Sequence, residues 1–207
     1  MSLKRPCLTY EDIRVESERF LGQYHPTRKL PIPIDAIVEF GLGLHIIPVP
    51  SLYQYVGANG FLTSDLSSIY VDQLQFEQYE QKYRFTLAHE IGHLVLHRDV
   101  YETVKLTSIS AFKDFYESVD SKDMSWFDTQ ASRFAELVLV PADRFREVCA
   151  AVARDRESDI RKFGDLTPDA WSYLAHDIAR PFNVSPGVVE CRLTREGIRD
   201  TKLRDYV

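Results

Sequence analysis

The 207-residue sequence has few cysteines, only Cys7, Cys149 and Cys191, and no two of them form a C-x-x-C pair. An odd number of scattered cysteines suggests neither a disulfide framework nor a zinc knuckle. Cysteines of this kind are typical of proteins in a reducing compartment, so we expect this protein to act in the cytoplasm.

Long hydrophobic runs are also missing. No apolar stretch approaches the roughly 18 residues that a membrane helix needs, and no signal-peptide core stands at the start, so we expect no membrane partner.

Positive charge is not in excess either, because the sequence has 25 lysines and arginines against 31 aspartates and glutamates, for a net charge of −6 at pH 7. This balance disfavours direct nucleic-acid binding through a broad basic face. The remaining composition fits a globular protein with one core, or with one domain and a small appendage.

The most informative segment is a helix expected around residues 85–96, which contains the motif HEIGH at 89–93. Residues four apart lie on one face of a helix, about 6 Å from each other, so His89 and His93 can bind one metal ion from adjacent turns. Glu90 lies on the neighbouring strip, where its carboxylate can act as a general base on a water molecule. The flanking residues are apolar almost all round, which indicates burial, and buried polar groups need compensation. A zinc site is therefore predicted, with hydrogen-bonded core histidines as the alternative.

Two other residues of this helix admit more than one interpretation. Gly92 costs about 1 kcal/mol in helix propensity, which indicates the close approach of either a substrate or another helix. His97 lies two turns beyond His89, about 12 Å away, so all three histidines cannot share one ion. We expect His97 to make a supporting or structural hydrogen bond, although a place at the substrate cleft stays open.

Before the motif helix, the sequence predicts a small, mostly antiparallel sheet. A first helix, capped by Thr9 with Asp12 three residues on, is expected to end near Gly22. The elements expected next are a short helix at 34–40, a strand at 44–49, and hairpin strands at 59–63 and 68–72.

After the motif helix, residues 99–123 suggest a long polar loop that carries several aromatic residues, and such a loop is usually a functional cover or poorly ordered. A helix is expected at 126–140, and Pro141 suits the first position of the next helix. Together these patterns predict an α+β fold in which the sheet packs on the buried motif helix. We place one domain at 1–164 and a helical C-terminal segment at 165–207.

That C-terminal segment has a helix-turn-helix outline. One helix is expected at 171–180, and a second begins at Pro186 with Ser185 as its cap. Acidic residues alternate with basic ones beyond the second helix, which favours a solvated structural role over DNA binding.

Three stretches together resemble the ImmA/IrrE family of metallo-endopeptidases. They are residues 84–97 (RFTLAHEIGHLVLH), 131–135 (ASRFA) and 139–141 (LVP), and the likeness covers about residues 10–145. The resemblance implies a zinc-dependent, gluzincin-like endopeptidase that acts in the cytoplasm on a separate protein, a helix-turn-helix transcriptional repressor. His89, His93 and a third ligand would bind zinc.

The third ligand is the open question of this site, because a catalytic zinc usually keeps three protein ligands. In the family, a glutamate three residues before the alanine of an E-x-x-A-N/D-x-F-A pattern is implied as that ligand. The matching position is Asp128, and Ser132 stands where the family has asparagine or aspartate. Aspartate reaches about 1.5 Å less far, so the two helices must approach more closely or the site is looser. Gln130, Glu102 and Glu117 remain alternatives.

Several features of the expected reaction stay open at this level. An oxyanion donor is expected from a tyrosine, histidine or arginine, and nothing distinguishes the eleven tyrosines. An edge strand at 57–63 or at 68–72 could bind an extended substrate.

Two other classes of function compete with the enzyme. One is a regulatory or toxin–antitoxin-like binding protein with a decayed metal site, which the departures at Asp128 and Ser132 would support. The other is a DNA-binding regulator, which the acidic charge disfavours.

Overall fold

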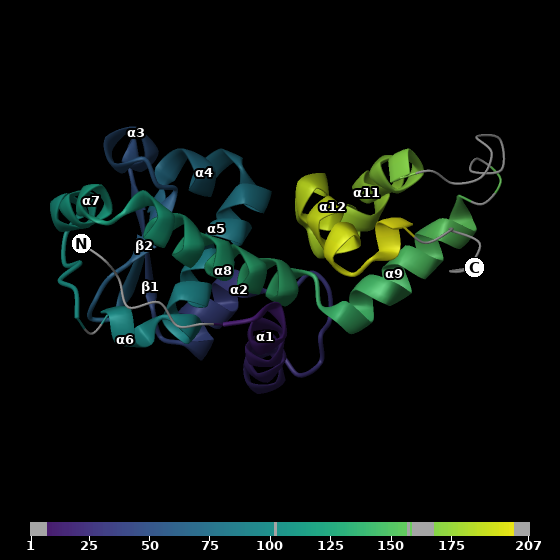
Figure 1. Cartoon of the computed structure of the whole chain (residues 1–207), viewed down its shortest axis with the longest axis horizontal. Coiled ribbons are helices and arrows are strands. Elements are labelled where there is room, and N and C mark those ends of the chain that lie inside the picture. Colours follow the sequence, from purple (N-terminus) through teal and green to yellow (C-terminus); the bar gives the residue numbers. More distant parts are fainter. Residues whose placement is uncertain (1–7, 102, 157, 159–167, 201–207) are drawn as a thin grey trace. The chain divides into compact units, whose positions relative to one another are not determined.

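The computed structural model describes residues 8–101, 103–156, 158 and 168–200 (Figure 1). Contacts divide the chain into two compact units, the first formed by 1–27 and 33–138 and the second by 28–32 and 139–207. The predicted domain boundary at 164/165 lies outside the described residues and stays a prediction.

The first unit begins with the predicted capped helix, α1 (Tyr10–Tyr24). The side chain of Thr9 accepts from the Asp12 N–H, and the Asp12 carboxylate accepts from the Thr9 N–H at 2.7 Å, which completes a capping box. The short helix expected at 34–40 is also present. It consists of α2 (Ile34–Ala36) and a single π-helical turn, η1 (Ile37–Gly41).

A three-stranded sheet follows, with strand order β1-β3-β2. β2 (Gly60–Leu62) and β3 (Ser68–Asp72) form the predicted antiparallel hairpin. β1 (His45–Val49) instead pairs parallel with β3, so the α+β class is confirmed but the sheet is mixed rather than mostly antiparallel. The parallel pairing requires a crossover between β1 and β3, and α3 (Leu52–Val56) together with β2 supplies it.

The motif lies on α5 (Glu80–Leu96), which follows α4 (Gln73–Gln78) and packs against β2 and β3. The predicted burial of this helix is confirmed, since residues on several of its faces are enclosed. Gly92 shows why one position must lack a side chain. A Cβ there would lie 2.9 Å from both the Cα and the carbonyl oxygen of Ala131, so of the two interpretations of this glycine the structure shows the helix–helix contact.

The prediction of a long loop at 99–123 is wrong. The described part of that segment contains α6 (Arg98–Tyr101) and α7 (Ile109–Ser118), and α8 (Ser121–Leu139) begins before the predicted residue 126. The side chain of Ser108 caps α7 by accepting from the Ala111 N–H at 3.1 Å. The aromatic residues at 112, 115 and 116 have the spacing of a helix face, and the polar residues between them obscure that period in the sequence.

The second unit is helical, as predicted for the C-terminal segment. It contains α9 (Ala142–Asp155), α11 (Pro168–Phe182), α12 (Pro186–Arg195) and a 3₁₀ turn, η2 (Ile198–Asp200). Its buried residues include Trp171, Phe145, Phe182 and Arg192, and the guanidinium of Arg192 pairs with Glu196 at 2.9 Å.

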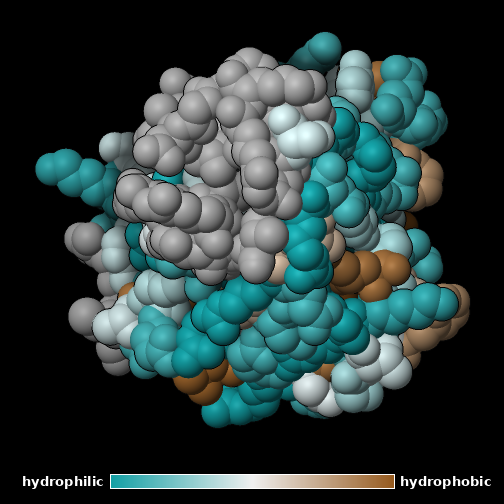
Figure 2. Space-filling model, turned by 90° about the vertical axis from the view of Figure 1, so that its right-hand side faces the viewer, coloured by the Kyte–Doolittle hydropathy of each residue, from teal (hydrophilic) through white to brown (hydrophobic). Residues whose placement is uncertain are grey.

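Figure 2 shows the molecule from the right-hand side of Figure 1. Hydrophilic residues cover most of the coloured surface on this side, and hydrophobic residues form small separate patches. Among the described helices, none combines the length and the apolar character that crossing a membrane would require.

Candidate metal centre

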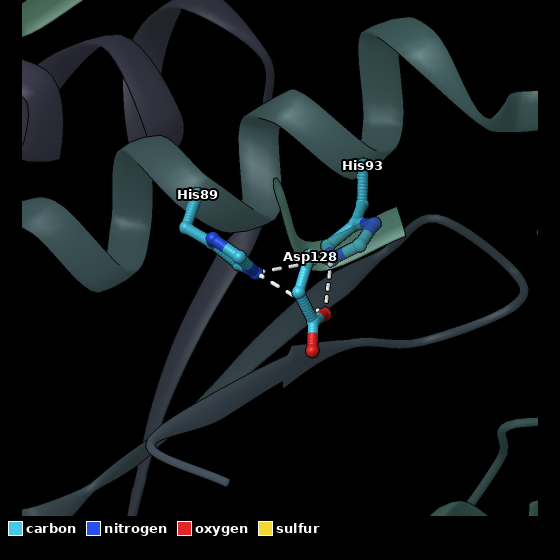
Figure 3. A group of neighbouring side chains, drawn as sticks. All are labelled: His89, His93 and Asp128. Carbon is cyan, nitrogen blue, oxygen red and sulfur yellow. Dashed lines mark hydrogen bonds and ion pairs between the residues drawn. The ribbon is translucent and has the colours of Figure 1, made fainter. Parts of the chain in front are cut away.

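Three of the predicted site residues meet beside α5. His89 and His93 project from consecutive turns of α5 toward Asp128 of α8 (Figure 3). The Nε2 atoms of the two histidines are 3.1 Å apart. The Oδ1 atom of Asp128 lies 3.8 Å from the Nε2 of His89 and 3.6 Å from the Nε2 of His93. One donor atom from each residue thus falls within 4.8 Å of the other two.

These distances fit a tetrahedral metal ion. Bonds of about 2.0–2.1 Å place tetrahedral ligand atoms about 3.3 Å apart, and the three observed separations of 3.1, 3.6 and 3.8 Å bracket that value. Two imidazoles and a carboxylate are also a common donor set for catalytic zinc, which leaves a fourth position open. The residues present therefore fit the metal that the motif predicts.

The electrostatics of the group suit a cation. Burial tends to raise the pKa of Asp128, but its contacts with His89 and His93 outweigh burial and hold that pKa well below its ordinary value. Burial alone would lower the pKa of His89, yet the nearby Asp128 and Glu90 raise it. Asp128 is therefore a carboxylate in the folded protein, and it can serve as an anionic ligand for a cation.

The close contact at Gly92 explains how the short side chain of Asp128 reaches the histidines. Ala131 lies one helical turn beyond Asp128 on α8, and its backbone touches α5 where Gly92 has no side chain. The two helices therefore approach as closely as their backbones allow. A close approach of the two helices is compatible with a short aspartate side chain at this position.

We expect Gly92→Ala to destabilise the protein, because the new Cβ would clash with the backbone of Ala131. The gain of about 1 kcal/mol in helix propensity is smaller than the roughly 1–3 kcal/mol that overpacking costs. Gly22→Ala is the matched control: Gly22 is an exposed residue of α1, and no other side chain or distant backbone atom lies within 4 Å of the place where its Cβ would be. That variant should gain about 0.4–1 kcal/mol. Urea unfolding measures both, and a Gly92→Ala protein as stable as the Gly22→Ala protein would contradict the contact.

The other candidates for the third ligand lie elsewhere. Gln130 hydrogen-bonds through its Oε1 to the Nε2 of His97 at 2.9 Å, and it is not one of the three grouped donors. Glu117 is exposed on α7, and Glu102 lies outside the described residues. Of the candidates that the structure describes, Asp128 alone lies with the two histidines.

His97 makes the supporting hydrogen bond that was expected of it. Its side chain is fully buried, and its Nδ1 lies 3.0 Å from the Nδ1 of His93. Burial lowers the pKa of His97 to about 3, so this imidazole is neutral near pH 7. On the other side of the site, the Oγ of Ser132 lies 3.2 Å from the Nδ1 of His89. Both histidines of the motif therefore have a partner on the ring nitrogen that points away from Asp128.

Glu90 is buried beneath the same site. One of its oxygens accepts a hydrogen bond from the Leu62 N–H of β2 at 3.0 Å, and burial raises the pKa of its carboxyl. Gly60 keeps β2 close to α5, because a Cβ there would lie 2.7 Å from the Cγ2 of Thr86 and 2.8 Å from the Tyr70 carbonyl. The edge strand thus holds Glu90 through its backbone.

A cavity of about 310 Å³ opens beside these residues. His89, Glu90, His93 and Asp128 line it together with a largely apolar wall. The wall includes Phe61, Phe85, Val100, Val104, Leu106, Phe112, Phe115, Met124 and Phe127. A peptide segment with an apolar side chain fits such a wall.

Two tyrosines that sequence reasoning could not single out also line this cavity. Tyr101 of α6 is buried, and its ring centre lies 6.2 Å from that of His93. Burial raises the pKa of Tyr101 well above its ordinary value, so its hydroxyl stays a hydrogen-bond donor. Tyr116 of α7 is half-buried on the same cavity. Spacing along the chain does not reveal either residue, because the helices that carry them lie in the segment predicted as a loop.

Comparison with known proteins identifies the class of this site. Residues 73–194, more than half of the chain, match the family model of peptidase M78, described as the IrrE N-terminal-like domain. A comparison with curated proteins found no match. The matched region contains the HExxH helix and the helix that carries Asp128, so the resemblance drawn from the motifs is confirmed. The chain belongs to the IrrE N-terminal-like family of M78 metallopeptidases.

Proposed function

We propose that this chain is a zinc-dependent endopeptidase that cleaves a specific cytoplasmic protein. The observation that carries the proposal is the convergence of His89, His93 and Asp128 within 4.8 Å, next to the buried Glu90 on one cavity. Membership of a metallopeptidase family supports the same reaction class.

Each residue has a distinct role in the proposed reaction. His89, His93 and Asp128 hold the zinc, which when bound would lower the pKa of water and polarise the scissile carbonyl. Glu90 accepts the proton of the attacking water and passes it to the leaving amine, and its raised pKa makes it a stronger base than an exposed glutamate. The Leu62 N–H holds the carboxylate of Glu90 in one orientation.

A donor for the developing oxyanion is also available on the cavity wall. Tyr101 lines the cavity beside His93 and keeps its hydroxyl proton. We assign it this role over Tyr116, because Tyr101 is the more deeply buried of the two and a hydrogen bond in a water-excluded site stabilises charge more strongly.

The sheet edge gives the proposed substrate a place to bind. β2 is an edge strand, and Gly60 and Phe61 line the cavity, whereas β3 lies in the middle of the sheet. Of the two segments proposed from the sequence, only the one at 57–63 therefore borders the site. An extended substrate beside it would place an apolar side chain against the aromatic wall.

The substitutions that supported a decayed metal site now support an intact one. Asp128 lies 3.6 Å from the Nε2 of His93, and Ser132 lies within hydrogen-bond distance of His89. Both contacts are of the kind that orients the ligands of a metal ion. We therefore favour the enzyme over the binding protein.

The proposed partner is a helix-turn-helix repressor, by the family resemblance. We expect the zinc-loaded protein to cut such a repressor at one or a few sites and to leave casein largely intact, because recognition by docking favours one folded partner. Mass spectrometry of both digests over time tests this. Rapid digestion of casein would contradict the selectivity. The choice of partner would be contradicted if the repressors encoded next to the gene of this protein stay intact when they are mixed with the zinc-loaded protein.

A further inference from the structure

A line of hydrogen bonds leads away from the metal centre on the side of His93. The Nδ1 of His93 lies 3.0 Å from the Nδ1 of His97, and the Nε2 of His97 lies 2.9 Å from the Oε1 of Gln130. The Nε2 of Gln130 donates in turn to the backbone carbonyl of Leu8 at 3.4 Å. His97 and Gln130 are both buried, with 0% and 2% of their surface exposed.

Each contact in this line needs one donor and one acceptor. A neutral imidazole has a proton on one ring nitrogen only, so it donates on one side and accepts on the other. The side-chain hydrogen-bond partners of His97 are an imidazole and an amide rather than a carboxylate, and its full burial favours the uncharged form. The direction of one hydrogen bond in the line therefore determines the direction of the next.

The carbonyl of Leu8 sets the direction, because a carbonyl oxygen can only accept. It binds the amide nitrogen of Gln130, which turns the amide oxygen of Gln130 toward His97. An amide oxygen also only accepts, so the Nε2 of His97 must carry the proton and its Nδ1 must accept. The Nδ1 of His93 then carries the proton, and its Nε2 faces His89 and Asp128 with a free lone pair.

We propose that Gln130 is a positioning residue that selects the tautomers of His97 and His93, so that the Nε2 of His93 is available to a divalent metal ion. The inference rests on the proposed function, since it takes His93 as a metal ligand. His89 differs in this respect. Its Nδ1 contacts the hydroxyl of Ser132, which can donate or accept and therefore selects neither tautomer.

Two variants of Gln130 separate this role from a structural one. Gln130→Glu and Gln130→Leu both lose the donor to the Leu8 carbonyl, but the carboxylate of Gln130→Glu still accepts from the Nε2 of His97. We expect zinc affinity, measured by competition with a chelating dye, to stay within about threefold of wild type in Gln130→Glu. In Gln130→Leu it should fall by about tenfold or more. Equal zinc affinity in the two variants, with equal stability toward urea, would overturn the proposal.

A second measurement does not depend on how the variants fold. The ¹⁵N chemical shifts of the histidine rings in the wild-type protein report which nitrogen is protonated. We expect His97 to be protonated at Nε2 in both the zinc-loaded and the metal-free protein. Protonation of His97 at Nδ1 would overturn the proposal. Wild-type protein that shows the expected tautomers and yet binds no zinc would leave the assignment standing and would count against the proposed function alone.

Discussion

Replacing Glu90 by glutamine should abolish proteolysis while the protein keeps its zinc. An amide cannot accept the proton of the attacking water, so we expect the cleavage rate to fall by at least about a hundredfold. The fold should persist, because the amide oxygen of glutamine can still accept from the Leu62 N–H that Glu90 contacts. The substitution also removes a buried carboxyl whose charged form is costly to bury. Repressor cleavage and zinc content are measured on the same preparation.

Glu117→Gln is the matched control for this variant. Glu117 is an exposed glutamate of α7 and was one of the alternatives for the third ligand. Its replacement should leave both cleavage and zinc binding unchanged. Proteolysis that survives in Glu90→Gln would exclude Glu90 as the base. Zinc lost from Glu90→Gln would mean that this residue supports the metal and not only the proton transfer.

Replacing His93 by alanine should remove most of the zinc. The variant loses one of three protein ligands, and each ligand contributes several kcal/mol to binding, so we expect the zinc affinity to fall by more than about tenfold. Asp128→Ala should weaken binding in the same direction, because its carboxylate lies 3.6 Å from the Nε2 of His93. Competition with a chelating dye gives both affinities.

His45→Ala is the control for these two variants. His45 is an exposed histidine of β1 in the same unit, away from the three grouped donors. Its loss should leave the zinc affinity at the wild-type value. An unchanged affinity in His93→Ala would place the metal elsewhere. If the zinc affinity is unchanged in Asp128→Ala but falls in His93→Ala, Asp128 is not the third ligand, and another residue such as Glu102 takes that place.

The predictions that succeeded rest on local geometry. Helical spacing alone puts His89 and His93 on one face, and the apolar flanks of the motif indicate the burial of α5. Capping residues gave the start of α1 for a similar reason, because Thr9 and Asp12 act within a single turn. Asp128 is different. Its place beside the histidines came from the family resemblance, since spacing along the chain does not reveal which carboxylate of another helix will reach them.

Apart from the helices missed at 99–123, the features that could not be predicted are contacts between distant segments. The pattern of a strand does not specify the direction of its partner, so the parallel pairing of β1 with β3 could not be predicted. The hydrogen bond between His97 and Gln130 joins residues 33 positions apart, and the close approach of Gly92 to Ala131 depends on how two helices pack. These tertiary contacts determine which ring nitrogen of His93 carries no proton, and how far the side chain of Asp128 must reach to the two histidines.

Metal analysis of wild-type protein purified without added zinc tests the central claim most directly. The proposed site predicts one zinc per chain, retained through purification in Glu90→Gln and lost in His93→Ala. Protein that is folded, contains no metal and takes up none on addition of zinc would contradict a metallopeptidase. It would instead favour a binding protein that kept the helices of this site without their chemistry.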